Sequence, residues 1–127
     1  MTQPVNILHV ITTLDSGGAE MMLYKLLATS DGSRYKHSVA CLAANGSMAE
    51  TFRQMGYPVT FLNLSSLNML LPTKWLSLRR LVHKVKPDIL QGWMYHGNAA
   101  ALAATYPALS QTLVLWNIRH SLYHIRH

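Results

Sequence analysis

The sequence is poor in cysteine and in acidic residues. Its 127 residues include one cysteine and five acidic residues, against eleven lysines and arginines, which gives a formal net charge of +6. A lone cysteine cannot form an internal disulfide, which is typical of a reducing cytoplasm. Cys41 lies in an apolar run, so we expect a buried thiol. The basic excess favours an anionic partner: a membrane surface, a phosphorylated substrate or a nucleic acid.

Long hydrophobic runs are also absent. No apolar run approaches the roughly 18 to 20 residues that a membrane-spanning helix needs, and the first four residues lack the basic start of a signal peptide. Half of the residues are apolar and 13% are charged, a composition that can bury a core. These features predict a soluble, cytoplasmic protein of one domain.

Several catalytic and binding motifs are missing. Gly17-Gly18 is followed by Ala19-Glu20, so the dinucleotide fingerprint G-x-G-x-x-G is incomplete, and no Gly-Lys-Ser or Gly-Lys-Thr marks a P-loop. The chain has no G-x-S-x-G nucleophile elbow and no helix-turn-helix pattern that would support DNA binding. Its seven histidines show no ligand spacing. We therefore expect no metal and no nucleic-acid partner.

The most informative stretch that is present covers residues 5–20. The apolar, β-branched segment Val5–Ile11 predicts a buried strand, and a polar turn ending in Gly17 and Gly18 leads into a helical pattern. The first N–H groups of a helix are unsatisfied and its dipole is positive there, so this arrangement suits an anion. The alternative is a tight turn without a ligand, in which Glu20 simply favours the dipole.

Strands and helices alternate along the rest of the chain. We expect strands at residues 5–11, 35–42, 57–62, 88–91 and 112–116. We expect helices from Ala19 onward and at residues 48–55, 74–86 and 99–106. The second helix has Ser47 as its expected N-cap, Glu50 as the third residue of a capping box and Gly56 as its end. The alternation predicts an α/β fold with a doubly wound parallel sheet.

The helix expected at residues 74–86 has one apolar and one mostly basic face. The apolar face is formed by Trp75, Leu78, Leu81, Val82 and Val85. One interpretation is an ordinary solvated face on a helix that covers the sheet. The other is a weak electrostatic contact with anionic lipid, which would place the protein peripherally at the inner face of the membrane.

Polar segments follow three expected strands, at residues 12–18, 93–98 and 117–121. Ligands of such sheets bind outside the carboxyl ends of the strands, so we expect these segments to converge on one edge. His96 and His120 are candidates for a general acid or base, or for holding a phosphate or hydroxyl. Arg119 is a permanent cation suited to phosphate. A surface or packing role is the alternative for each histidine.

Together these segments resemble the family 4 glycosyltransferases. The likeness rests on ILHVITTLDSGGAE near the start, Lys86-Pro87-Asp88-Ile89-Leu90, Trp93-Met94-Tyr95-His96-Gly97-Asn98 and Trp116-Asn117-Ile118-Arg119-His120-Ser121. Gly-Gly-Ala-Glu, in its order with the other segments, is the most specific part. Members of this family have the GT-B fold, in which two Rossmann-like domains face each other across a cleft. The likeness covers nearly the whole chain but only the N-terminal domain of the family.

The resemblance implies roles for individual residues. Gly17 and Gly18 would form the loop near the donor phosphate or transferred sugar, and Glu20 would fix that loop. His96 would lie in the acceptor pocket, while Arg119 and His120 would line the cleft. The implied catalytic residues are His96 and His120. The implied substrate-binding residues are Gly17, Gly18, Glu20, Trp93, Asn98 and Arg119. By the same resemblance no metal is required.

The chain departs from the family pattern in two respects. Many members carry histidines where this chain has Gln91 and Trp93. The donor-binding Glu-x7-Glu of the C-terminal domain is absent, because the only glutamates are Glu20 and Glu50. We therefore expect residues 1–127 to be an N-terminal domain that is incomplete at its C-terminal end. Such a chain would be inactive without the missing C-terminal donor domain.

Three hypotheses about function follow. The first is the acceptor-side half of a retaining glycosyltransferase, which moves sugar from a nucleotide-sugar donor to a glycan, lipid-linked or polysaccharide acceptor. The second is a stand-alone, non-catalytic nucleotide- or phosphate-binding module. The third is a non-catalytic interaction domain that keeps the fold. A downstream Glu-x7-Glu would favour the first, and saturable mononucleotide binding by these residues alone would favour the second.

Overall fold

The computed structural model describes residues 3–14, 18–63, 72–93 and 113–117, with only the backbone at 72–75 and 113–117. The elements in chain order are β1 (Val5–Ile11), α1 (Gly18–Thr29), β2 (Tyr35–Cys41), α2 (Ala49–Gln54), β3 (Val59–Phe61), α3 (Pro72–Val85), β4 (Ile89–Trp93) and β5 (Leu113–Asn117). The helix expected at residues 99–106 lies outside the described residues.

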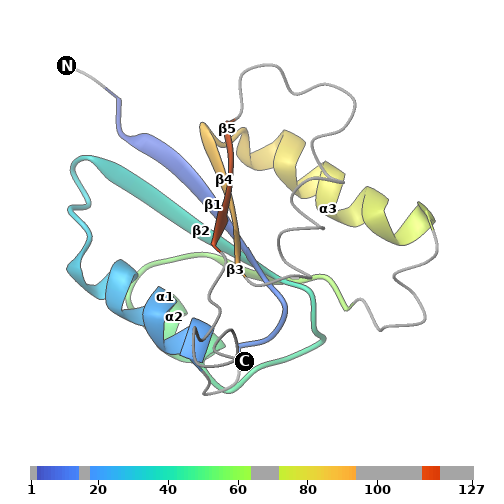
Figure 1. Ribbon diagram of the computed structural model, residues 1–127, viewed down its shortest axis with the longest axis horizontal. Coiled ribbons are helices and arrows are strands. Elements are labelled where there is room, and N and C mark those ends of the chain that lie inside the picture. Colours follow the sequence, from blue (N-terminus) through green and yellow to red (C-terminus); the bar gives the residue numbers. More distant parts are fainter. Residues whose placement is uncertain (1–2, 15–17, 64–71, 94–112, 118–127) are drawn as a thin grey trace, which may run out of the picture.

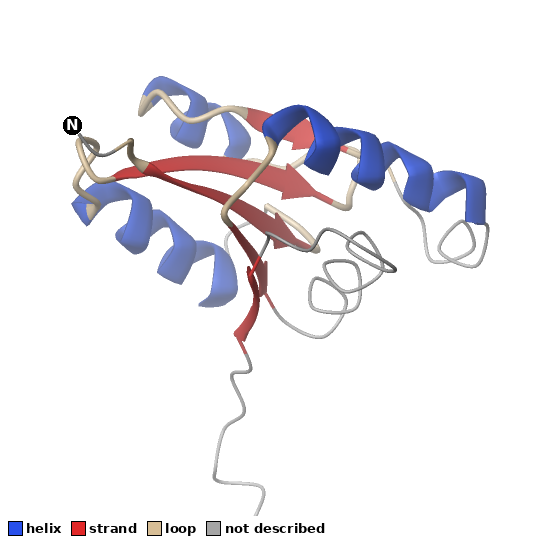
Figure 2. Ribbon diagram, turned by 90° about the horizontal axis from the view of Figure 1, so that it is seen from above, coloured by secondary structure: helices blue, strands red, loops and turns tan. Residues whose placement is uncertain are grey.

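All five strands are parallel and form one sheet in the order β3-β2-β1-β4-β5. Helices α1 and α2 cover one face of this sheet and α3 covers the other (Figure 1). The strands run side by side with the helices outside them (Figure 2). The crossover through α3 carries the chain from β3, at one edge, to β4 on the far side of β1. The fold is therefore a doubly wound, Rossmann-like α/β sheet, as predicted.

Apolar side chains cover both faces of the sheet. On the α3 side, the core consists of Leu8, Val10, Ala40, Leu42, Leu78, Val82 and Leu90. On the side of α1 and α2, it consists of Ile11, Leu14, Leu23, Leu27, Val39, Cys41, Ala49, Phe52, Val59 and Trp93. A strand buried on both faces needs apolar residues at nearly every position, which explains the continuous apolar runs of β1 and β2. The Cys41 thiol is buried, as expected.

Helix α3 presents the predicted face to the sheet. Its buried or partly buried apolar side chains are Leu78, Leu81, Val82 and Val85. Its exposed side chains are Leu76, Ser77, Arg80, His83 and Lys84. The side chain of Trp75 lies outside the described residues. Among the described residues, no helix combines the length and apolar composition needed to cross a membrane.

The end of α3 is tied to the start of β1. The Asn6 side-chain amide donates to the Val85 carbonyl at 2.7 Å, which satisfies one of the free carbonyl groups at a helix C-terminus. Asp88 is bonded to Asn6 twice, because its carboxylate accepts the Asn6 backbone N–H at 2.9 Å and its own N–H donates to the Asn6 carbonyl at 2.7 Å. These bonds align β4 with β1.

The predicted cap of α2 was wrong. Met48, not Ser47, is the N-cap residue, and no side chain caps the first turn. The Met48 backbone N–H donates to the Leu14 carbonyl at 2.8 Å, which anchors this loop to the loop after β1. The helix ends at Gln54 with Met55 as its C-cap residue, one residue earlier than predicted. Gly56 follows, as predicted, with a φ of 95° that glycine adopts without strain.

Strand and helix bounds differ from the prediction at several places. The bounds of β1 are those predicted, while β2 ends one residue early, at Cys41, and β5 covers Leu113–Asn117. Strand β3 is only Val59–Phe61, because the Tyr57 N–H bonds back to the Phe52 carbonyl at the end of α2. Helix α1 begins at Gly18 rather than at Ala19. Strand β4 continues through Trp93, which the sequence placed in a polar loop.

Candidate functional site

The carboxyl ends of β1 and β4 form the switch point of the sheet. These strands are neighbours, and Ile11 at the end of β1 pairs with Trp93 at the end of β4. From there the strand order runs in opposite directions, to β2 on one side and to β5 on the other. In open α/β sheets, ligands bind in the crevice outside such a point. The residues after Ile11 and the first turn of α1 are therefore the described part of the candidate site.

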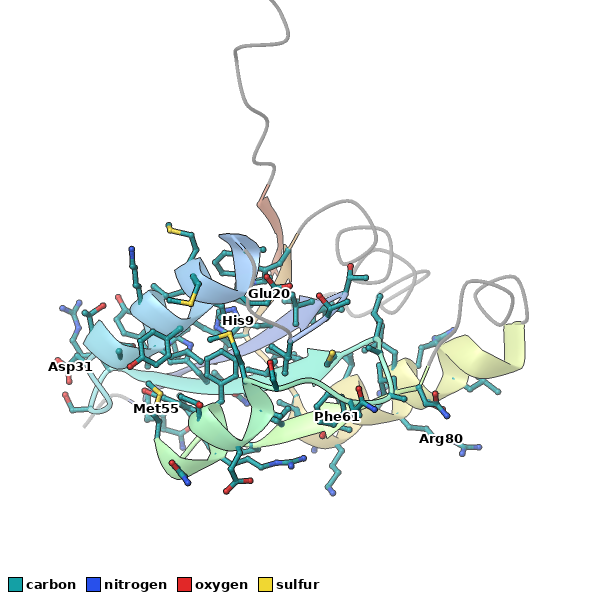
Figure 3. All side chains as sticks on the ribbon, turned by 90° about the horizontal axis from the view of Figure 1, so that it is seen from below. His9, Glu20, Asp31, Met55, Phe61 and Arg80 are labelled. Carbon is teal, nitrogen blue, oxygen red and sulfur yellow. The ribbon has the colours of Figure 1, made fainter. Side chains whose placement is uncertain are left out.

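Glu20 ties the first turn of α1 to the loop after β1. The Thr13 hydroxyl donates to Oε1 of Glu20 at 2.7 Å. The Glu20 side chain is only 8% exposed, and Figure 3 shows it on the α1 side of the sheet. A carboxylate in the first turn is stabilised by the positive end of the helix dipole. The bond and the burial together hold the loop and the helix start in one arrangement.

Thr12 places an unpaired hydroxyl at the same strand end. Its carbonyl accepts the Ala43 N–H at 3.1 Å and the Cys41 thiol at 3.6 Å, which fixes its backbone. Its side-chain oxygen is buried and has no hydrogen-bond partner in the described part of the chain. A buried hydroxyl without a partner is costly. The Ser38 hydroxyl on β2 is in the same condition, so an unpaired hydroxyl is not specific to this strand end.

Gly18 leaves open space beside the first turn of α1. It is exposed, and a Cβ built on it would meet no atom within 4 Å. Gly46 differs, because a Cβ there would lie 2.6 Å from the Cβ of Leu14. The packing of the described residues thus requires a glycine at position 46 but not at position 18. The free space at Gly18 is available to a ligand that approaches the helix N-terminus.

Four buried or partly buried side chains form a chain of hydrogen bonds under the candidate site. The Trp93 indole N–H donates to Nδ1 of His9 at 3.0 Å. Nε2 of His9 lies 2.8 Å from Nδ1 of His37, and Nε2 of His37 lies 2.7 Å from Oγ of Ser30. We call Trp93, His9, His37 and Ser30 the His9 relay. It runs from the carboxyl end of β4, through β1 and β2, to the residue that follows α1. Figure 3 labels His9 in the middle of this chain.

Burial keeps both histidines of the relay neutral. Burial, and to a smaller extent the neighbouring His37, lower the pKa of His9 to about 3. Burial also lowers the pKa of His37. A charged imidazole loses its hydration in such a site, which favours the neutral form. At neutral pH these imidazoles therefore act as hydrogen-bonding groups.

Of the residues predicted for the site, the structure describes Gly18, Glu20 and Trp93. It brings Gly18 and Glu20 together in the first turn of α1. Trp93 ends β4 in the core and is 4% exposed, so its side chain points into the protein under α1. The other predicted residues lie outside the described residues: Gly17, His96, Asn98, Arg119 and His120. Their roles stay predictions.

The sequence analysis missed His9 and His37. Both are polar residues inside otherwise apolar strands, and that interruption is the one signal that the sequence offers. In the register of β1 and β2, Ile7 pairs with His37 and His9 pairs with Val39. Side chains two residues apart share a face of a sheet, so two buried imidazoles on adjacent strands can meet diagonally.

No metal site is found in the described part of the chain, where no group of three or more His, Cys, Asp and Glu side chains could hold an ion. The site geometry thus consists of a helix N-terminus, a buried carboxylate, two threonine hydroxyls and the relay below them.

No model of a known protein family matches the sequence, and no curated protein matches it either.

Proposed function

We propose that the chain is the acceptor-side, N-terminal domain of a retaining glycosyltransferase, which transfers sugar from a nucleotide-sugar donor to a glycan, lipid-linked or polysaccharide acceptor. The observation that supports this most directly is the open first turn of α1 at the switch point. There Gly18 leaves free space and Glu20 is held away from solvent by Thr13. This agrees with the resemblance of the Gly-Gly-Ala-Glu segment to family 4.

The chemistry of sugar transfer matches this arrangement. The bond to the leaving diphosphate breaks more easily when donors and positive potential are placed where its negative charge develops. The N–H groups of the first turn of α1 supply such donors. The Glu20 carboxylate is buried and bonded to Thr13, whereas Gly18, the first residue of that turn, is exposed. In the proposal, Arg119 and His96 contribute the cation and the acceptor-side group that the sequence predicts.

The alternative is a stand-alone, non-catalytic module that binds a nucleotide or a phosphate. It rests on the same helix N-terminus and needs no partner domain. The two proposals differ in what the described residues do alone: a binding module holds the nucleotide tightly by itself, whereas an acceptor-side domain contributes to turnover only when a donor domain faces it.

The test compares nucleotide-sugar hydrolysis and transfer by this chain and by the same chain with any coding sequence that follows His127. UDP-, GDP- and ADP-sugars serve as donors. His96→Ala and Arg119→Ala test the predicted site. Gly18→Ala fills the space beside α1, and Gly32→Ala is its matched control, because a Cβ at Gly32 also meets nothing within 4 Å. Gly32 lies in the turn between α1 and β2, away from the carboxyl ends of the strands.

We expect activity only in the extended protein. His96→Ala and Arg119→Ala should abolish it. Gly18→Ala should reduce it, whereas Gly32→Ala should not. Tight mononucleotide binding by the short chain, with no transfer by either protein, would establish the binding module instead. If neither protein transfers sugar and the short chain does not bind a mononucleotide, both proposals are overturned.

A further inference from the structure

The direction of every hydrogen bond in the His9 relay is fixed by one residue. An indole N–H can only donate, so Nδ1 of His9 must accept from Trp93. A neutral imidazole that accepts at Nδ1 carries its proton at Nε2, and that proton points to Nδ1 of His37. By the same reasoning, His37 carries its proton at Nε2 and donates it to the hydroxyl oxygen of Ser30. Both imidazoles are thus Nε2–H tautomers.

The relay also joins the two strands that bracket the crevice. Trp93 is the last residue of β4, and His9 lies in the middle of β1. Their rings lie 6.0 Å apart between centroids, inclined at 46°. The His9 and His37 rings are stacked, with centroids 5.1 Å apart and planes at 23°, which extends the connection to β2. Side chains therefore link three neighbouring strands, from Trp93 at the carboxyl end of β4 to His37 in the amino half of β2.

The alternative orientation of the relay is blocked. If His9 carried its proton at Nδ1, that N–H would face the indole N–H, and two buried donors would be left without acceptors. A second proton on His37 would put two N–H groups face to face across the 2.8 Å contact with His9. A second proton on His9 would face the Trp93 indole N–H across the 3.0 Å contact. Buried donors without acceptors are strongly disfavoured. The network has one arrangement in which every bond is made.

We propose that Trp93, His9 and His37 are positioning residues of the candidate site: their one-way hydrogen-bond chain fixes the orientation of the β1 and β4 ends, outside which the ligand binds. The proposal rests on the proposed function only in treating this crevice as the ligand site. In this proposal Trp93 acts as a buried hydrogen-bond donor to His9, in place of the substrate contact that the resemblance implies.

The first test measures the tautomers by 15N NMR of the imidazole nitrogens in the whole chain. We expect His9 and His37 to be Nε2–H tautomers at neutral pH. Trp93→Phe keeps an aromatic ring but removes the donor, so His9 should lose its single tautomer. Tyr57→Phe is the matched control, because it removes a hydroxyl that donates to the Leu27 carbonyl at 2.9 Å. That control leaves every bond of the relay in place.

The second test asks whether the relay controls the strand ends. His9→Gln keeps one acceptor and one donor in the same side chain, whereas His9→Leu keeps neither. We expect the backbone amide signals of Thr12, Thr13 and Gly18 to move in Trp93→Phe and His9→Leu. They should stay close to those of the parent chain in His9→Gln and Tyr57→Phe. Thermal unfolding of each variant shows whether it is folded, and only folded variants are compared.

UDP is the probe for binding. If the parent chain binds it, Trp93→Phe should weaken binding about ten-fold, the effect of roughly one lost hydrogen bond, and His9→Gln should restore most of it. If the parent chain does not bind UDP, the alternative of a stand-alone binding module fails, while the amide signals still decide this inference. Unchanged signals at Thr12, Thr13 and Gly18 in both Trp93→Phe and His9→Leu would overturn it, as would an Nδ1–H tautomer of His9 in the parent chain.

Discussion

His9 and His37 face each other across adjacent strands with 2.8 Å between Nε2 of one ring and Nδ1 of the other. One proton occupies this contact, and a second would place two donors in opposition. The His37 ring also packs against the Tyr57 ring in a T-shaped arrangement, with 5.7 Å between the ring centroids. The centroids of the His37 and Tyr35 rings lie 6.3 Å apart. No described carboxylate bonds to either imidazole, so nothing in that part of the chain compensates for a positive charge there.

The stability of the fold should therefore fall in mild acid. The folded pKa of His9 is about 3, below its ordinary value of 6.5. Between these pH values the unfolded chain binds more protons than the folded one, so the free energy of unfolding rises with pH and this contribution is complete above 6.5. The slope should be up to about 1.4 kcal/mol per pH unit, and the whole effect is on the order of 5 kcal/mol at most.

Urea unfolding at a series of pH values measures this slope. His9→Gln is the appropriate variant because it cannot titrate but can make both hydrogen bonds of the relay. We expect its stability to depend much less on pH than that of the parent chain between pH 6 and about 4. Equal slopes for the two proteins would show that His9 is not the group responsible.

Thr13→Val should destabilise the chain by about 1 to 3 kcal/mol, because it leaves the buried Glu20 carboxylate without its hydroxyl partner. Thr29→Val is the matched control: its hydroxyl donates to the Lys25 carbonyl at 2.8 Å on the exposed side of α1. That change should cost about 0.5 kcal/mol or less. Chemical denaturation of both variants gives the comparison, and equal losses would contradict the role given to Glu20.

Gly46→Ala should destabilise the chain by about 1 to 3 kcal/mol, since the new Cβ would collide with Leu14 and force the loops after β1 and β2 apart. The collision involves the Leu14 backbone, whose carbonyl carbon would lie only 2.9 Å away. A flexible side chain could move aside, but this backbone cannot do so cheaply. Gly32→Ala should be nearly neutral in the same thermal unfolding experiment.

Leu78→Ala should cost about 2 to 5 kcal/mol, because it removes a fully buried side chain between α3 and the sheet. Leu76 lies two residues earlier on the same helix and is 45% exposed. Leu76→Ala should therefore change stability by about 0.5 kcal/mol or less. The pair measures which side of α3 is packed, and a larger loss for Leu76→Ala would reverse that assignment.

The exposed side of α3 should bind anionic vesicles weakly if its basic face contacts lipid, which is one of the two interpretations of the sequence. Arg80 and Lys84 are exposed there, and Leu76 adds an apolar contact. Each of Arg80→Gln and Lys84→Gln should weaken binding to phosphatidylglycerol vesicles roughly five-fold, from about 1 kcal/mol per basic residue near the surface. Sedimentation against phosphatidylcholine vesicles is the control. Lys25→Gln, at an exposed position of α1, should leave vesicle binding unchanged. Equal binding by the parent chain and all variants would reject the lipid contact.

The sequence predicted those features that depend on neighbouring residues. The bounds of β1 follow from seven consecutive residues that suit a strand buried on both faces. The inner face of α3 follows from apolar residues at helical spacing. The parallel sheet follows from the order of the elements, because alternating strands and helices leave few other architectures.

The features that the sequence did not predict depend on residues far apart in the chain. Trp93 was placed in a loop because aromatic and polar residues follow it, yet its partner His9 lies 84 positions away. Ser47 has the chemistry of an N-cap, but the Leu14 carbonyl takes the Met48 N–H and moves the helix start. Such pairings exist only after the sheet has formed.

The bonds between Asn6 and Asp88 span 82 positions in the sequence. They imply an order of events during folding. The pairing of β1 with β2 closes a short loop, whereas the pairing of β1 with β4 must wait until α3 has been synthesised and has crossed the sheet. On the ribosome, β1 would spend that interval as an open edge of a three-stranded intermediate. The crevice between β1 and β4 is thus among the last parts to assemble, and a chaperone that shields β1 at that stage should raise the yield of folded chain.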